Sequence, residues 1–204
     1  MKFKLEEHNN TMKGLSPSEI ISWALSGATK PIITTNFGPF SASLIHAVVS
    51  QSPKIEVIWI DTGYNTSHTY KHATETIKQM KLNIHTYVPK QTVAHRNVLL
   101  GIPSLNDPKH AIFTEQVKLE PFRRAMNIHK PDVWFTNLRK GKTDFRNKLD
   151  ILSYSKDGIL KVCPFFNYSD KDLEKYLKNY QLQNETKYFD PTKQIENREC
   201  GLHY

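Results

Sequence analysis

The sequence predicts an α/β protein of three layers, in which helices flank a mainly parallel, twisted sheet. Short runs rich in β-branched residues alternate along the chain with amphipathic segments of about 10 to 15 residues, which is typical of strands joined by crossover helices. The run at residues 55–60 is apolar at nearly every position, as expected for a strand covered on both faces. Together these two observations favour a parallel sheet between two layers of helices.

Each predicted element has a local signal of its own. Ser16 is expected to cap the first helix, because Pro17 suits a first turn and Glu19 completes a capping box. Thr66 and Ser169 are candidate caps of two later helices. The spacing of apolar residues then predicts strands at 31–35, 55–60, 83–88, 133–136 and 159–162, and helices at 40–49, 66–80, 114–127 and 170–179.

Length and composition indicate one folded domain. The sequence shows no repeat, linker or low-complexity segment, so residues 1–204 are predicted to form a single domain. Its core is expected at about 16–180, followed by a C-terminal tail at about 181–204. Ten Phe, nine Tyr and three Trp supply bulk for packing in a chain whose hydrophobic share is only 38%.

The charge indicates anionic partners. The formal net charge of +8 suits a nucleotide or another substrate that carries several negative charges. The basic residues are spread along the chain without a long tract, which disfavours binding to nucleic acid. No apolar run approaches the roughly 18 residues of a membrane span, and the N-terminus lacks the apolar segment of a signal peptide. We therefore expect no nucleic-acid partner and no membrane association.

Cysteine usage indicates a reducing compartment. Cys163 and Cys200 are the two cysteines of the chain, too few for a disulfide framework or for a four-cysteine metal or cluster site. The expected location is the cytoplasm, where thiols stay reduced, and no bound metal or cofactor is expected. Cys163 ends an apolar run and is interpreted as a buried small hydrophobic residue.

Two polar segments follow predicted strands, where parallel sheets bind their ligands. The turn at residues 34–38 precedes a helix and can present backbone N–H groups and hydroxyls to a phosphate or sulfate, although an ordinary turn has the same pattern. The carboxylate after the second strand can accept a hydrogen bond from a ribose or an adenine, or simply cap its turn. The candidate binding residues are Thr34, Thr35, Asn36, Phe37 and Gly38 in the first segment and Asp61, Thr62 and Gly63 in the second.

Basic residues follow the predicted strand at 133–136. Arg139, Lys142 and Arg146 lie in this loop, and arginine binds phosphate and sulfate through paired N–H donors. The loop is therefore a candidate oxyanion clamp, with a solvated surface loop as the alternative. His68 and His72 have the spacing of a metal pair on a helix, but without a third ligand they are interpreted as surface or packing residues.

Cys200 lies close to the end of the chain, within R-E-C-G-L-H-Y. The thiolate is the reactive form of cysteine and nearby cations stabilise it; here Arg198 and His203 can supply them. Gly201 gives the backbone freedom to fold the tail over a pocket. Cys200 is therefore a candidate nucleophile, although a terminal cysteine can also be incidental.

Taken in order, these motifs resemble the thioredoxin-dependent phosphoadenylylsulfate (PAPS) reductases. The resemblance runs from about residue 16 to the end, over T-T-N-F-G, D-T-G-Y, E-P-F-R-R-A, W-F-T-N-L-R, K-V-C-P and the terminal E-C-G-L-H. D-T-G-Y alone is a weak signal, whereas E-C-G-L-H after the others is specific. The resemblance implies an adenine nucleotide α-hydrolase-like fold with the cysteine on a C-terminal tail, and a homodimer, which is common in the family.

The activity that the resemblance implies belongs to assimilatory sulfate reduction. The enzyme would convert 3′-phosphoadenylyl sulfate to sulfite and adenosine 3′,5′-bisphosphate through an S-sulfocysteine on Cys200, which thioredoxin or glutaredoxin would resolve. Relatives that use adenylylsulfate carry a four-iron cluster on paired cysteines, which are missing here. The resemblance implies catalytic roles for Cys200 and His203, a modified phosphate loop at residues 34–38, a nucleoside contact at Asp61, and substrate contacts at Arg139, Arg146 and Arg198.

One segment departs from the family pattern. Family members usually carry a sequence like G-Y-x-S-x-G-D-x-x-T-T-R before the cysteine tail, and its basic end helps to hold the nucleotide. This chain has K-Y-F-D-P-T-K-Q-I-E-N in that place. Either Lys187, Lys193 and Arg198 take over the role, or the substrate is held more weakly or is a different one.

Two other functions are compatible with the same fold. An ATP pyrophosphatase or adenylyltransferase would carry a loop of the S-G-G-x-D-S type, which T-T-N-F-G does not match, and would not need a terminal cysteine. A non-catalytic nucleotide-binding homologue would not need the intact E-C-G-L-H ending. Both remain alternatives to the reductase.

Overall fold

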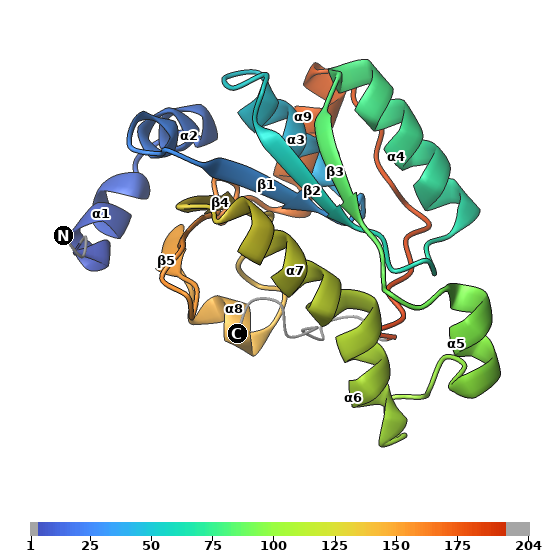
Figure 1. Ribbon diagram of the computed structural model, residues 1–204. Coiled ribbons are helices and arrows are strands. Elements are labelled where there is room, and N and C mark those ends of the chain that lie inside the picture. The colour runs from blue at the N-terminus through green and yellow to red at the C-terminus, as the bar shows by residue number, and fades with distance from the viewer. Residues whose placement is uncertain (1–3, 195–204) are drawn as a thin grey trace.

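The computed structural model describes residues 4–194, and in that part of the chain the strands form one six-stranded sheet (Figure 1). Neighbouring strands are parallel except at one edge, where the last pair is antiparallel. The predicted mainly parallel sheet is thereby confirmed. The strand order is β3 (Asn83–Tyr87), β2 (Glu56–Ile60), β1 (Pro31–Thr35), β4 (Val133–Phe135), β6 (Leu160–Val162) and β5 (Leu152–Tyr154).

Helices cover both faces of the sheet, and Figure 1 shows α7 on one side with α3, α4 and α9 on the other. Successive side chains of a strand point to opposite faces, so Ile32 of β1 packs with the α7 cluster and Ile33 with the α3 and α9 cluster. The helices are α1 (Leu5–Met12), α2 (Pro17–Ser26), α3 (Ser41–Val49), α4 (Ser67–Met80), α5 (Val93–Leu99), α6 (Lys109–Thr114), the π-helix η1 (Glu115–Leu119), α7 (Glu120–His129), α8 (Asp144–Asn147) and α9 (Asp170–Asn179).

The predicted helix caps are confirmed. Ser16 and Glu19 form a capping box at the start of α2. The Thr66 side chain accepts a hydrogen bond from the backbone N–H of Thr69 at the start of α4. Ser169 caps α9 through a second capping box. Each signal lies within four consecutive residues, which is why it could be recognised without the fold.

The predicted helix at 114–127 is wrong in its bounds and in its regularity. The structure has a continuous run of α6, η1 and α7, with a π-helical turn in the middle. Pro121 lacks a backbone N–H and therefore cannot donate to the carbonyl four residues earlier, which favours a wider turn just before it. Val117 and Lys118 of η1 are both buried.

Several short elements were not predicted, namely α1, α5, α6, α8 and β5. Helix α8 has four residues and strand β5 has three, too few for a periodic pattern. Strand β5 exists because it pairs with β6, which is a contact that local sequence does not encode. Among residues 4–194, no helix has the length and apolar character needed to span a membrane.

Candidate functional site

A cavity of about 620 Å³ opens at the carboxyl edge of the central strands. Ile33 of β1 pairs in parallel register with Phe135 of β4, so the residues that follow the two strands leave the sheet side by side. A further wall comes from residues 188–190 and 193–194, which follow α9 in the sequence. The cavity therefore lies where a parallel sheet is expected to bind its ligand.

The loop between β1 and α3 is shaped largely by its own side chains. Thr35 Oγ1 accepts a hydrogen bond from the N–H of Phe37 at 2.9 Å, and Asn36 Oδ1 accepts from the N–H of Gly38 at 3.0 Å. Such bonds from a side chain to the backbone two residues on are typical of polar turns. The Thr34 hydroxyl is held from outside the loop, since it accepts a hydrogen bond from the indole N–H of Trp134, in β4, at 2.8 Å.

Phe37 contributes its backbone rather than its side chain to this loop. Its φ of 50° is in the left-handed region, and its ring lies in the core, edge to face with Trp59 at a centroid distance of 5.1 Å. The side chain is fully buried and does not line the cavity. The other predicted residues of the loop, Thr34, Thr35, Asn36 and Gly38, do line it.

The N-terminal end of α3 lines the cavity. Ser41, its first residue, is 7% exposed, and its hydroxyl has no hydrogen-bond partner within residues 4–194. Asn137 donates to the carbonyl of Phe40 at 3.0 Å, while its Oδ1 atom is likewise without a partner in the described part of the chain. The positive end of a helix dipole and a free hydroxyl together favour an anion at this point.

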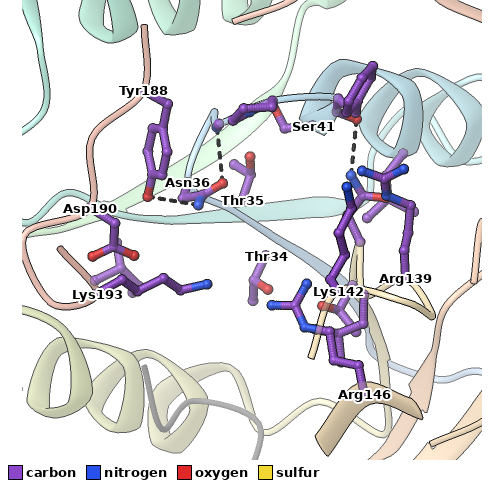
Figure 2. Close-up of a pocket in the computed structure, with 18 of the residues that line it drawn as sticks. Thr34, Thr35, Asn36, Ser41, Arg139, Lys142, Arg146, Tyr188, Asp190 and Lys193 are labelled. Atoms are coloured by element: carbon purple, nitrogen blue, oxygen red, sulfur yellow. Dashed lines mark hydrogen bonds between the residues drawn. The ribbon is translucent and has the colours of Figure 1, made fainter. Parts of the chain in front are cut away.

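Three cations from the segment after β4 line one side of the cavity (Figure 2). Arg139 donates to Asp170 Oδ1 at 2.5 Å, and Lys142 donates to Asp170 Oδ2 at 3.0 Å. Burial acts to raise the pKa of Asp170, but these two cations outweigh it and hold the pKa below its ordinary value. Arg146, from α8, is the third cation on this side.

The opposite side is built from residues that are distant in sequence. Asn36 Nδ2 donates to the Tyr188 hydroxyl at 2.8 Å and so joins the β1–α3 loop to the segment after α9. Lys118 of η1 donates to Asp190 at 2.5 Å, and both side chains are buried. Lys193 lines the same side and points across the cavity in Figure 2. The cavity therefore has cations on two facing sides.

The second predicted segment, Asp61 to Gly63, does not line this cavity, although the preceding Ile60 does. Asp61 Oδ1 accepts hydrogen bonds from the N–H of Gly63, from Asn65 and from the Tyr70 hydroxyl, each at 2.9 Å. This is the turn-capping arrangement that was the alternative to ligand binding. The role of Asp61, Thr62 and Gly63 in binding stays a prediction.

The remaining candidates divide into confirmed interpretations and untested ones. Cys163 is buried in the core, and burial raises the pKa of its thiol to about 12, so its interpretation as a small hydrophobic residue is confirmed. His68 Nδ1 lies 2.8 Å from Glu185, and His72 is buried. No group of three potential metal ligands occurs among residues 4–194. The predicted residues Arg198, Cys200 and His203 lie outside the described residues.

Besides Ser41 and Asn137, four charged or phenolic residues of the cavity were not predicted to bind a ligand. Lys118 lies between Val117 and Leu119, but the next residues outward, Gln116 and Glu120, are polar, so the local sequence carries no clear signal for a buried lysine. Asp170 was interpreted only as the start of the last helix. The other two are Tyr188 and Asp190, in the segment that departs from the family pattern.

Known proteins are similar to this chain in sequence and in fold. Residues 30–190 match the family described as the phosphoadenosine phosphosulfate reductase domain. A phosphoadenosine 5′-phosphosulfate reductase of Xylella fastidiosa (strain 9a5c) is 32% identical, over 87% of this chain and 76% of that protein. The phosphoadenylyl-sulfate (PAPS) reductase from Candida auris, solved as a phosphate complex, has a TM-score of 0.78 at 23% identity, over 91% of this chain and 89% of that one.

Solved structures of a second enzyme class resemble this chain less closely than the PAPS reductase does. The FMN adenylyltransferase of Candida glabrata has a TM-score of 0.58 at 11% identity, and the match covers 83% of this chain but 56% of that one. That likeness concerns the fold alone. The family match, by contrast, extends over most of the sequence and includes the β1–α3 loop, the basic segment after β4 and the wall up to Asp190. The chain therefore belongs to the phosphoadenosine phosphosulfate reductase family, with its adenine nucleotide α-hydrolase-like fold.

Proposed function

We propose that this protein reduces 3′-phosphoadenylyl sulfate to sulfite and adenosine 3′,5′-bisphosphate through an S-sulfocysteine on Cys200. The observation that carries the proposal is the cavity at the sheet edge, whose cations stand on two facing sides. A ligand that matches both sides carries separated negative charges, as a sulfonucleotide does with its sulfate and its phosphates. Membership of the reductase family supports the same substrate class.

Each wall of the cavity has a part in this proposal. Arg139 and Arg146 neutralise the oxygens of one anionic group of the substrate. The N-terminal end of α3, at Ser41, binds a second anionic group. The family's basic segment before the cysteine tail has no counterpart here, and Lys187 and Lys193 were proposed to replace it. Of these two lysines, only Lys193 lines the cavity, so Lys193 is the one that can take over the role. Residues 61–63, which follow the end of β2, remain candidates for binding the nucleoside.

The first chemical step forms one bond and breaks one. The Cys200 thiolate attacks the sulfate sulfur, and the bond from that sulfur to the bridging phosphate oxygen breaks. Adenosine 3′,5′-bisphosphate leaves with the electron pair. Arg198 and His203, which are close to Cys200 in sequence, stabilise the thiolate, while the cations of the cavity neutralise the oxygens as charge shifts.

The second step is the reduction. A thiolate of thioredoxin or glutaredoxin attacks the Cys200 sulfur, and sulfite leaves with the electron pair of the sulfur–sulfur bond. The partner's second thiol then resolves the mixed disulfide, so Cys200 returns as a thiolate and the partner becomes a disulfide. The partner's dithiol supplies both electrons, so the proposal requires no bound cofactor.

Intact-protein mass spectrometry tests the first step. Reduced protein is mixed with 3′-phosphoadenylyl sulfate without added thiol, and the expected product carries one SO₃ group on Cys200 that thioredoxin removes as sulfite. Cys200→Ser is expected to stay unmodified. Cys163→Ala is the matched control and is expected to form the adduct, because Cys163 is buried and does not line the cavity.

Two results would contradict the proposal. One is wild-type protein that stays unmodified with both 3′-phosphoadenylyl sulfate and adenylyl sulfate. The other is sulfite production by Cys200→Ser at the wild-type rate. An adduct formed with adenylyl sulfate and not with the 3′-phosphorylated nucleotide would reverse the substrate assignment and leave the cysteine chemistry in place.

A further inference from the structure

A hydrogen bond joins Trp134, a residue of the core, to Thr34, a residue of the cavity wall. Trp134 is 1% exposed and does not line the cavity, whereas Thr34 does. Ile32 of β1 pairs with Trp134 of β4, and Thr34, two positions after Ile32, points to the same face of the sheet. The indole nitrogen therefore reaches Thr34 at the carboxyl end of β1, and it lies 2.8 Å from the hydroxyl oxygen.

The direction of this bond determines what Thr34 offers to a ligand. An indole nitrogen only donates, so Thr34 Oγ1 accepts, and the bond favours one rotamer of the side chain. The Thr34 hydroxyl makes no second hydrogen bond within residues 4–194, so its own proton is left to donate. Figure 2 shows Thr34 between Lys193 and Arg146, which line facing sides of the cavity. The hydroxyl is thus a donor where an anionic group is expected.

The need to satisfy a buried N–H group does not by itself explain the bond. Buried indole N–H groups usually have an acceptor. Yet the indole N–H of Trp59, a residue of the neighbouring strand β2 that is 7% exposed, has no partner in the described part of the chain. The fold therefore tolerates such a group without an acceptor. The ring of Phe122 packs on Trp134 at 5.2 Å between centroids and helps to hold the indole in place.

We propose that Trp134 is a positioning residue for the binding of the sulfonucleotide. By donating to Thr34 Oγ1, it holds the hydroxyl so that the O–H donates to an anionic oxygen of the substrate, on the sulfate or on a phosphate. The accepted bond also polarises the hydroxyl and makes it a stronger donor. This inference rests on the proposed function, which names the substrate. It assigns Trp134 an effect on ligand affinity that is separate from its place in the core.

Calorimetry on the Cys200→Ser protein measures affinity for intact 3′-phosphoadenylyl sulfate, because no sulfur transfer is expected there. Adding Thr34→Val removes the hydroxyl at nearly constant volume and should weaken binding by about 10- to 100-fold, as the loss of a hydrogen bond to a charged group does. Trp134→Phe keeps the hydroxyl but removes its support, and should weaken binding by about 3- to 10-fold. Thr34→Ser keeps the O–H group and should retain most of the affinity; a loss as large as in Thr34→Val would overturn the inference.

A double-mutant cycle tests whether Trp134 acts through Thr34. In the Thr34→Val background no hydroxyl is left to hold, so Trp134→Phe is expected to change the affinity by less than about twofold. Equal factors in the two backgrounds would overturn the inference.

Trp59→Phe is the matched control for the loss of an indole. It makes the same change at a buried tryptophan whose N–H has no partner within residues 4–194, and the affinity should stay within about twofold. A loss as large as that in Trp134→Phe would show that packing alone is responsible, which contradicts the positioning role.

Proton NMR reports the bond without changing it, and it decides the matter if Trp134→Phe does not fold. In the Cys200→Ser protein, the indole N–H signal of Trp134 should move downfield when 3′-phosphoadenylyl sulfate binds, because a hydroxyl that donates to an anion accepts more strongly. Trp23, in α2, does not line the cavity and is the internal reference. No movement at saturation, or the same movement in Thr34→Val, refutes the inference.

A second ligand identifies the group that Thr34 contacts. If Thr34→Val weakens the binding of adenosine 3′,5′-bisphosphate by the same factor, the oxygen belongs to a phosphate; if that affinity is unchanged while affinity for the sulfonucleotide falls, it belongs to the sulfate. Unchanged affinity for both ligands overturns the inference and leaves the proposed function in place, provided that wild-type protein forms its adduct on Cys200. Absence of that adduct refutes the proposed function instead, so the two failures are distinguishable.

Discussion

Replacing Phe37 by alanine is expected to destabilise the protein strongly, although the residue belongs to a loop that lines the cavity. The side chain is fully buried, and its ring lies edge to face with Trp59 at 5.1 Å between centroids. Replacing a buried phenylalanine by alanine costs about 3 to 5 kcal/mol, and an aromatic contact of this kind accounts for about 0.5 to 1.5 kcal/mol. Phe37→Ala should therefore lower the free energy of unfolding by about 3 to 5 kcal/mol and Tm by roughly 10 °C.

Two neighbouring variants provide the comparison. Phe37→Leu keeps most of the apolar volume and should cost only about 1 to 2 kcal/mol. Asn36 is exposed, and Asn36→Ala removes its hydrogen bonds with Gly38 and Tyr188, which are worth about 0.5 to 1.5 kcal/mol each. We expect Asn36→Ala to lower nucleotide affinity more than stability, and Phe37→Ala to do the reverse.

Urea unfolding followed by far-UV circular dichroism measures the stability of each variant, and calorimetry with adenosine 3′,5′-bisphosphate measures affinity. A Phe37→Ala protein whose free energy of unfolding stays within about 1 kcal/mol of wild type would refute the core position of the ring. So would a larger loss of stability in Asn36→Ala than in Phe37→Ala.

Three further outcomes follow from the geometry. Gly63→Ala should destabilise by about 1 to 3 kcal/mol in thermal unfolding, because φ is 82° and a Cβ atom would lie 2.4 Å from Val93; an unchanged Tm would argue against this backbone conformation. Cys163 should resist iodoacetamide at pH 8 in the native protein and react in urea, since burial raises the pKa of its thiol to about 12; peptide mapping that finds native Cys163 alkylated would contradict its burial. Burial acts to raise the pKa of Asp190, but Lys118 outweighs burial and holds that pKa below its ordinary value of 3.8. The ionised carboxylate therefore stabilises the fold above pH 3.8, and this stabilisation is lost as the pH falls through the pKa of the folded state. The difference in unfolding free energy between wild type and Asp190→Asn should therefore shrink from pH 7 to pH 3, and a constant difference would show that the charge is not responsible.

Much of the fold could be predicted because its signals are local. Ser16, Thr66 and Ser169 each accept a hydrogen bond from a backbone N–H three residues further on, so the helix itself brings the atoms together. Strand β2 could be recognised from its apolar run, because both faces of this strand are covered and its side chains are therefore nearly all buried. The short elements were missed for the opposite reason: β5 depends on pairing with β6, and α8 is only one turn long.

The candidate site was predicted where it follows directly from strand ends. The turn at residues 34–38 and the basic segment with Arg139 and Arg146 lie at neighbouring strand ends, and the parallel register brings them to one cavity. Of the opposite wall, the sequence offered Lys193 as a possible basic contact but not Lys118, Tyr188 or Asp190. The contacts from Asn36 to Tyr188 and from Lys118 to Asp190 cross 152 and 72 positions, and they form only when helices have packed and the chain has returned over the sheet edge.

The amino-acid sequence by itself determined most of the longer helices and most of the strands, three of the helix caps, and the polar turns that follow β1 and β4, because these depend on hydrogen bonds and side-chain periodicity within a few residues. The tertiary structure alone decided that the Phe37 ring enters the core, that Asp61 holds its own turn, and that Lys118 meets Asp190 beside the cavity. Those outcomes depend on which surfaces are buried against each other, and burial is a property of the packed chain rather than of any short stretch of it.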